Sequence, residues 1–175
     1  EAPVLVLRFE KEWMVPGGAG NTIYNACRLG ARVSAFGIVG ADERGRQLTA
    51  TLKSGGVEVS GVLENPAWKT ITKMRVLAGD EHRTKQQVVR INYEPSMAVA
   101  GEWTDRLLAC VRERIGRVDA LILSDYEYGT IGEQMIRWAG GLQGKVVVAD
   151  SRTRIERFRG ITAVTPNEEE AGRAL

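Results

Sequence analysis

Several short groups of polar residues have the types and spacing needed to bind a polar small molecule. The sharpest is a glycine turn, Gly17-Gly18-Ala19-Gly20-Asn21, which opens a predicted amphipathic helix over residues 21–29. Glycines at a helix start let backbone N–H groups approach a hydroxyl or an anionic ligand, and the amide of Asn21 both donates and accepts hydrogen bonds. The alternative is a structural turn in which Asn21 is the helix N-cap. The turn is neither a dinucleotide-binding fingerprint nor a Walker loop.

Polar residues also follow three apolar segments that are predicted to be buried strands, over residues 119–123, 146–149 and 161–164. The residues in question are Asp125 after the first strand, Asp150 and Arg152 after the second, and Asn167 and Glu170 after the third. Ligands of open parallel sheets bind outside the carboxyl ends of the strands. We therefore expect a polar small molecule to bind at this edge of the sheet.

The rest of the sequence supplies the elements that position these residues. Hydrophobic periodicity and glycine stops predict strands over 4–9, 33–39 and 57–59 and helices over 43–53, 103–115 and 131–138. Two alternating stretches, 70–76 and 86–93, predict an antiparallel hairpin with one solvated face. The predicted fold class is α/β, a parallel sheet flanked by helices with a small antiparallel β lid. We assign residues 17–67 and 95–175 to the α/β core, and residues 1–16 and 68–94 to the lid.

The composition excludes several classes of protein. The 175 residues include 24 basic and 22 acidic side chains, a net charge of +2, which argues against a nucleic-acid or membrane-surface partner. Two cysteines that are far apart and a single histidine argue against a disulfide framework and exclude a multi-histidine metal site. No signal peptide or spanning segment is visible in the sequence, so we expect a cytoplasmic protein.

Taken together, the motifs resemble those of the ribokinase-like, or PfkB, carbohydrate kinases. The resemblance rests on the glycine turn, on Leu29-Gly30-Ala31 and on Gly37-Ile38-Val39-Gly40-Ala41-Asp42-Glu43-Arg44-Gly45. Segments 70–76, 123–126, 157–160 and 165–167 look most like the kinases of bacterial ADP-heptose synthesis, which phosphorylate heptose 7-phosphate. The resemblance implies a ribokinase-like fold and an enzyme that uses ATP and magnesium to phosphorylate a sugar or sugar phosphate.

The resemblance also implies roles for individual residues. The sugar side comprises the turn residues Gly17, Gly18 and Asn21, with Asp125 expected to contact the same ligand. Asp150 and Arg152 correspond to residues near the nucleotide phosphates, and Arg152 matches by charge only, since the heptose kinases usually read Asp-Pro-Lys there.

Asn167 and Glu170 match the family's Asn-x-x-Glu motif, which lies near the metal and the nucleotide phosphates. A carboxylate and an amide at a helix start can organise magnesium and its waters. The alternative is that the two residues form only a capping box, which has the same spacing.

The predicted lid carries two basic residues, Lys73 and Arg75, which strand alternation places on one face. If the other face packs inward or across a dimer, the basic face could close over the glycine turn and meet a phosphate already on the sugar. The alternative is a solvated face, where lysines also deter aggregation. Lids in this family often meet across a dimer, so the resemblance implies a homodimer through the β lid.

Two departures from the family pattern limit what the resemblance implies. Tyr128 stands where the heptose kinases commonly have a lysine, which removes a cation. The Gly-x-Gly-Asp motif that carries the general-base aspartate is not in the sequence, and we expect it beyond Leu175; the family's first strand is expected before Glu1. The chain is therefore expected to be truncated at both ends. Alternatives are a non-catalytic sugar-binding or assembly module derived from a truncated kinase, and a nucleoside kinase.

Overall fold

The computed structural model describes residues 4–79 and 84–174. Small parts of the predicted lid, residues 1–3 and 80–83, lie outside the described residues. The helices are α1 (Ala19–Arg28), α2 (Glu43–Ser54), α3 (Gly101–Ile115), α4 (Glu133–Gly140) and α5 (Glu168–Ala174), with a 3-10 turn at Ile155–Arg157. The strands are β1 (Ser34–Gly40), β2 (Glu58–Asn65), β3 (Thr72–Ala78), β4 (Gln86–Tyr93), β5 (Ala120–Asp125), β6 (Val146–Ser151) and β7 (Ala163–Val164).

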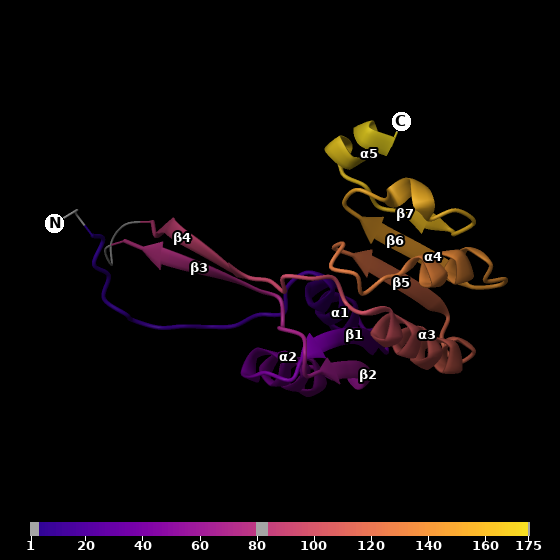
Figure 1. Ribbon diagram of the computed structural model, residues 1–175, viewed down its shortest axis with the longest axis horizontal. Coiled ribbons are helices and arrows are strands. Elements are labelled where there is room, and N and C mark those ends of the chain that lie inside the picture. Colours follow the sequence, from indigo (N-terminus) through magenta and orange to yellow (C-terminus); the bar gives the residue numbers. More distant parts are fainter. Residues whose placement is uncertain (1–3, 80–83, 175) are drawn as a thin grey trace.

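Parallel strands with helices packed on them form the body of the molecule (Figure 1), which confirms the predicted α/β class. The strands make two sheets rather than one: β1 pairs with β2, and β6 lies between β5 and β7. No strand of the described ranges bridges β1 and β5, which explains the division. Strand β2 is longer than the one predicted at 57–59, because its residues from Gly61 to Asn65 pair with β1.

Apolar stripes on the helices fill the core. Leu107, Leu108 and Val111 of α3 form one buried cluster with Met135, Ile136 and Ala139 of α4 and with Leu123, Val147 and Ala149 of the three-stranded sheet. Phe36, Ile38 and Leu63 of the two-stranded sheet pack against the same cluster. The spacing of three and four residues along each helix puts these side chains on one face. A second cluster, made by Ala35, Leu52 and Val57, fixes α2 on the two-stranded sheet. Packing of the core therefore fixes the positions of the strand ends, and so the positions of the polar residues there.

The predicted hairpin is present as the antiparallel pair β3 and β4, which projects from the body (Figure 1). Side chains from Gln86 to Asn92 are exposed on both faces of β4. Val88, Val89 and Ile91 are each about two-fifths exposed, so the described lid has no core of its own. Its position depends on contacts at its base.

The strand predicted at residues 4–9 is wrong. Residues 4–17 have no regular secondary structure, and the apolar side chains of Val4, Val6 and Phe9 are exposed. A strand needs a neighbouring edge to accept and donate its backbone hydrogen bonds, and no described strand pairs with this segment. An ion pair between Glu10 and Lys85 (2.8 Å) places the segment beside the start of β4.

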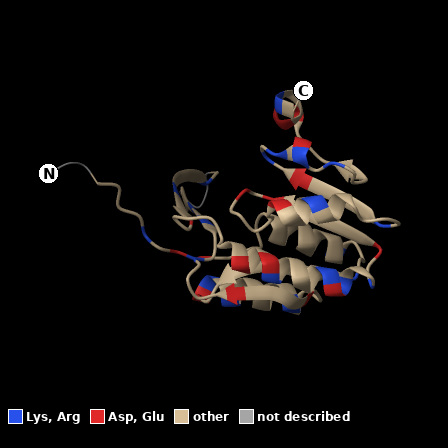
Figure 2. Cartoon of the chain, turned by 45° about the vertical axis from the view of Figure 1, so that its right-hand side comes forward, with Lys and Arg blue, Asp and Glu red and all other residues tan. Residues whose placement is uncertain are grey.

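The charged side chains are mixed over the body. Figure 2 shows Lys and Arg interspersed with Asp and Glu along the helices. Where signs alternate in this way, long-range attraction to a polyanion is weak. No helix within the described part of the chain is both long enough and apolar enough to cross a membrane.

Candidate active site at the carboxyl edge of the sheet

The glycine turn forms the start of α1. Gly18 is the N-cap residue, with φ 52° and ψ −130°, a conformation that side chains other than glycine rarely allow. The helix therefore begins at Ala19, and the alternative that Asn21 is the N-cap is wrong. Asn21 lies in the first turn, exposed, and its Oδ1 accepts a hydrogen bond from Asn25 Nδ2 (3.3 Å). No side chain caps this helix start, which leaves it open to a ligand oxygen.

Tyr126 joins the glycine turn to the carboxyl ends of β5 and β6. A Cβ atom added to Gly18 would lie 3.3 Å from Cε2 of the Tyr126 ring. The guanidinium of Arg152 lies over the same ring, with 4.9 Å between Cζ and the ring centroid. Asp125 and Ser151 are paired as the last residues of β5 and β6. Tyr126 and Arg152 are therefore the first residues after the two strands. The structure thus brings Gly18 and Arg152 to one aromatic ring.

Asp125 is 3% exposed, and its carboxylate is occupied by groups of the protein itself. Its Oδ2 accepts hydrogen bonds from Arg154 Nη2 (2.6 Å) and Nε (3.1 Å) and from Ser151 Oγ (3.0 Å). Its Oδ1 accepts one from the backbone N–H of Glu127 (3.0 Å). In this arrangement Asp125 fixes the loops after β5 and β6, and a sugar would have to displace Arg154 to reach it. Its contact with a ligand stays a prediction.

Asp150 was expected after the strand but lies inside β6, paired with Ser124, because the β5–β6 ladder continues to Ser151. Asn167 and Glu170 follow the neighbouring strand β7. The N–H of Thr165 donates to the carbonyl of Ala149 (3.1 Å), so the chain passes the end of β6 before α5 begins. Asn167 Oδ1 accepts from the N–H of Glu170 (2.9 Å), and Glu170 Oε2 accepts from the N–H of Asn167 (2.9 Å). This reciprocal pair is a capping box, as the structural alternative predicted.

The capping box still leaves Glu170 Oε1 outside its two hydrogen bonds. Magnesium prefers oxygen ligands and is usually bound by one or two carboxylates together with substrate phosphates and waters. Asn167 and Glu170 fit that donor set. In the described ranges no three His, Cys, Asp or Glu side chains are close enough to hold a metal ion. The metal-binding role of Asn167 and Glu170 stays a prediction.

The segment from Gly37 to Gly45 forms a second helix start, at α2. Asp42 caps it: Oδ1 accepts from Gly45 N (2.8 Å) and Thr70 Oγ1 (2.7 Å), and Oδ2 accepts from Thr70 N (2.9 Å). Thr70 Oγ1 in turn accepts from the N–H of Gly40 (2.9 Å). Burial alone would raise the pKa of Asp42, but the hydrogen bonds from Thr70 and Gly45 lower it below its usual value. This network joins β1, α2 and the base of the lid.

The basic residues of the lid lie on β3. The pairing with β4 is regular from Thr72 to Val76, which places Lys73 and Arg75 on one face, as predicted. Arg90 lies directly across from Arg75, and like charges in opposite positions of a sheet repel each other. Among the described residues, no carboxylate pairs with these cations, and no hydrogen bond joins them to the glycine turn. The lid therefore presents three cations without bringing them to the turn.

Tyr128, at the position where the resemblance led us to expect a lysine, links the loop after β5 to the segment after the lid. Its hydroxyl donates a hydrogen bond to Glu94 Oε1 (2.7 Å), and its carbonyl accepts one from Val99 N (3.4 Å). Burial raises the pKa of Tyr128, and the Glu94 carboxylate raises it further. The phenol is thus neutral near pH 7 and brings no charge to the site.

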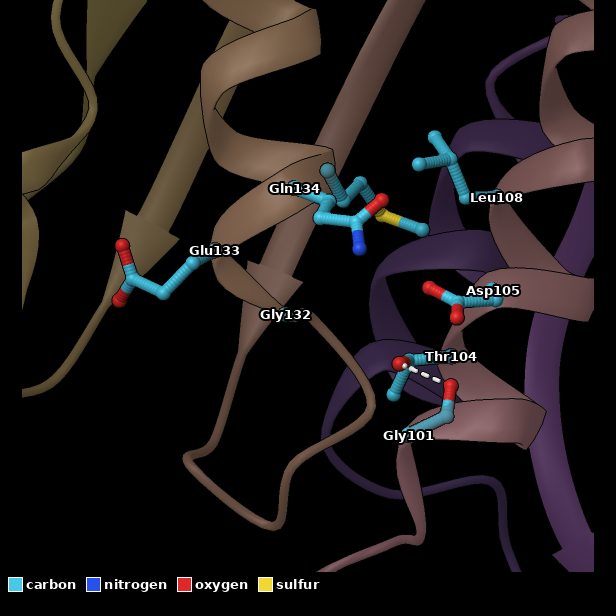
Figure 3. Close-up of a pocket in the computed structure, with 8 residues that line it drawn as sticks. Gly101, Thr104, Asp105, Leu108, Gly132, Glu133 and Gln134 are labelled. Atoms are coloured by element: carbon cyan, nitrogen blue, oxygen red, sulfur yellow. Dashed lines mark hydrogen bonds between the residues drawn. The ribbon is translucent and has the colours of Figure 1, made fainter.

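A hollow of about 230 Å³ lies elsewhere, between α3 and the start of α4 (Figure 3). Its lining residues are Gly101, Thr104, Asp105, Leu108, Gly132, Glu133, Gln134 and Met135. Figure 3 shows Glu133 pointing away from Asp105, and Glu133 pairs instead with Arg157 (2.6 Å). None of the predicted site residues lines this hollow, so we place the candidate site at the glycine turn and the strand ends.

Sequence reasoning missed several residues that build this site. It gave no role to Arg154, because the partner Asp125 lies 29 positions away and no local pattern links the two. It gave none to Tyr126, whose contacts come from two other segments. Arg90 could have been found, because alternation along residues 86–93 predicts which of its side chains share a face.

Comparison with known proteins agrees with the motifs. The pfkB family of carbohydrate kinases matches residues 2–175. The chain is 38% identical, over 99% of its length, to the bifunctional protein HldE of Gluconobacter oxydans, and 37% identical, over 98% of its length, to that of Geobacter metallireducens. It covers 36% and 35% of these two relatives, so it spans about a third of their length.

Solved structures share the fold at lower identity. A putative sugar kinase from Clostridium perfringens gives a TM-score of 0.63 at 20% identity, over 90% of this chain and 49% of that one. Fructokinase with bound ATP from Xylella fastidiosa gives 0.56 at 21% identity, over 90% of this chain and 46% of that one. The ribokinase-like fold is thereby confirmed. With motifs, fold and family match in agreement, the chain belongs to the pfkB family of carbohydrate kinases.

Proposed function

We propose that the protein containing this chain transfers phosphate from ATP to a hydroxyl of a sugar or sugar phosphate in the cytoplasm, with heptose 7-phosphate as the favoured acceptor. The observation that carries the proposal is the contact of the Tyr126 ring with both Gly18 and Arg152. It sets the turn that resembles a sugar site beside the strand end that resembles a nucleotide-phosphate site. Family membership and the ATP bound to the similar fructokinase support ATP as the donor.

The acceptor side of the site is the open start of α1. Backbone N–H groups at Gly17 and Gly18 and the exposed amide of Asn21 bind sugar hydroxyls, which fixes the acceptor hydroxyl for in-line attack. The hydroxyl oxygen forms a bond to the γ-phosphorus while the bond to the bridging oxygen of ADP breaks. The hydroxyl proton passes to a general base, for which we propose an aspartate encoded beyond Leu175.

The phosphate side consists of residues at the end of β6 and after β7. Arg152 and Asp150 lie by the nucleotide phosphates, where the arginine stabilises negative charge as the phosphoryl group moves. Asn167 and Glu170 would hold magnesium together with the phosphates, and magnesium, when bound, neutralises charge on the transferring group. The capping box sets the direction of both side chains at the start of α5.

The lid contributes to acceptor choice and to assembly. Lys73 and Arg75, with Arg90 across the hairpin, bind the phosphate already on the sugar when the lid closes. The exposed apolar side chains and edges of β4 are covered in a homodimer by a second lid. Light scattering during size-exclusion chromatography at micromolar concentration should give the mass of a dimer, and a monomer would contradict the assembly.

An ADP-release assay on the full-length protein tests the function. The acceptors are heptose 7-phosphate, unphosphorylated heptose, fructose and adenosine. We expect turnover to be fastest with heptose 7-phosphate, and no turnover by the 175-residue chain if the proposed base lies beyond Leu175. Preference for adenosine would favour a nucleoside kinase. No turnover with any acceptor would favour a non-catalytic sugar-binding or assembly module. Sugar-stimulated turnover by the 175-residue chain would show that the base lies within it.

A further inference from the structure

We infer that Tyr126 is a positioning residue for phosphate transfer, because its ring sets the acceptor turn at a fixed separation from Arg152. The inference rests on the proposed function, which places the acceptor at Gly18 and the nucleotide phosphates at Arg152. It adds a residue for which neither the motifs nor the family match provides a role. The ring lies against both sides of the site.

The turn side of the contact depends on glycine. Gly18 has a positive φ, and a Cβ atom there would lie 3.3–3.6 Å from three ring atoms of Tyr126. The ring therefore occupies the space next to Gly18 that a side chain would fill. A smaller residue at position 126 would leave a gap under the helix start, and the turn would lose the surface that fixes its height above the sheet.

The strand side of the contact is rigid. Asp125, the residue before the ring, is buried and bonded to Ser151 and Arg154, so the ends of β5 and β6 are tied together. Arg154 Nη2 also donates to the carbonyl of Ile131 (3.1 Å), which anchors the end of the loop that Tyr126 begins. The position of the ring is thus set by buried hydrogen bonds rather than by the ligand.

Arg152 completes the arrangement, because its guanidinium lies over the ring and is otherwise exposed. A cation over an aromatic face is attracted to the ring, and this limits the positions that a long side chain samples. In phosphate transfer, a displacement of the reacting groups by about 1 Å can lower the rate about 100-fold. A ring that positions both the turn and the arginine therefore affects the rate without touching either substrate.

The test compares Tyr126→Leu, which removes the aromatic ring, with Tyr126→Phe, which keeps it, in the full-length protein. We expect Tyr126→Leu to lower kcat roughly 10- to 100-fold and to raise KM for ATP about 2- to 5-fold through loss of the arginine contact. KM for heptose 7-phosphate should stay within about 2-fold of that of the unchanged protein, since the turn's own donors remain. Tyr126→Phe should keep both kcat and KM for ATP close to those of the unchanged protein.

Trp138→Leu is the matched control, because Arg112 lies over that ring (5.8 Å to the centroid) in the last turn of α4, away from the strand ends. It should leave both KM values unchanged. A loss of folded protein lowers the apparent kcat but does not raise KM for ATP. Unchanged kcat and KM in Tyr126→Leu would overturn this inference alone. So would a Tyr126→Phe variant whose kcat and KM for ATP change as much as those of Tyr126→Leu. Absence of turnover in the unchanged protein would overturn the proposed function, and this inference with it.

Discussion

The starts of α1 and α2 differ although both lie in glycine-containing segments that resemble the same family signature. At α2, the side chain of Asp42 accepts hydrogen bonds from Gly45 and Thr70, so the protein's own groups occupy the helix start. At α1, Gly18 has no side chain, and no other side chain caps the helix. A motif match alone does not separate binding from folding. The hydrogen-bond partners do, because a side-chain carboxylate occupies the start of α2, whereas the start of α1 has no side-chain acceptor.

The largest expected effect comes from closing the open helix start. Gly18→Ala strains a positive φ and presses a methyl group against Tyr126, so we expect kcat/KM for the sugar to fall about 100-fold. Gly30→Ala is the matched control at the other end of α1, because Gly30 also has a positive φ (96°) and nothing within 4 Å of an added Cβ. It should lose stability only. Equal losses of kcat/KM in both variants, measured in the full-length protein, would contradict the assignment.

We also expect the acceptor to extend from α1 to the basic residues of the lid. Replacing Lys73 or Arg75 by Ala removes a charged hydrogen bond to the acceptor's phosphate, so KM for heptose 7-phosphate should rise roughly 10- to 100-fold. KM for unphosphorylated heptose should change little. Arg90→Ala should behave like Arg75→Ala, since the two are paired across the hairpin. An equal rise in KM for both acceptors, or no rise for either, would show that these residues belong to a solvated face and bind no substrate phosphate.

The third prediction concerns the closed helix start. Asp42→Ala leaves donors at Gly45 and Thr70 without an acceptor, so we expect a loss of about 2 kcal/mol in the free energy of unfolding. Activity per folded molecule should remain. Glu43→Ala, an exposed carboxylate in the same turn, should change stability much less. Urea unfolding followed by circular dichroism measures both, and similar losses would show that Asp42 is not a structural cap.

The same residue gives a pH dependence. Because the folded-state pKa of Asp42 lies below its unfolded value of about 3.9, its contribution to stability is fully present above that pH. The contribution is lost as the pH falls through the folded-state pKa. The stability difference between the unchanged protein and Asp42→Asn should therefore shrink from pH 7 to pH 3. A difference that is constant over this range would contradict the lowered pKa.

The smallest expected effect separates the two roles of Glu170. Glu170→Gln preserves a capping box, since Gln also accepts from the backbone at that position, so stability should change by less than about 0.5 kcal/mol. The loss of charge should still raise, several-fold, the magnesium concentration that gives half-maximal turnover. Asn167→Ala removes the cap and should lower stability by about 1 kcal/mol. An unchanged magnesium requirement in Glu170→Gln would show that Asn167 and Glu170 only cap the helix.

The sequence predicted what depends on local pattern. Periodicity located α3, α4 and the hairpin because apolar spacing and turn residues act over a few positions. It failed at residues 4–9, where strand-forming side chains have no neighbouring edge to pair with. It also failed to foresee that Asp125 is engaged by Arg154, since that contact depends on how two strand ends pack. The candidate site residues came from the family resemblance. The contact of Tyr126 with Gly18 and Arg152 could be found only in the structure.

Hydrogen exchange of the full-length protein, with and without heptose 7-phosphate and a non-hydrolysable ATP analogue, tests the central claim most directly. We compare a peptide spanning residues 16–24, at the start of α1, with one spanning 40–48, at the start of α2. Binding at the open helix start predicts slower exchange in the first peptide on addition of the sugar phosphate, and no change in the second, where Gly40 and Gly45 already donate to Thr70 and Asp42. Protection confined to residues 40–48, or equal protection of both peptides, would contradict the account.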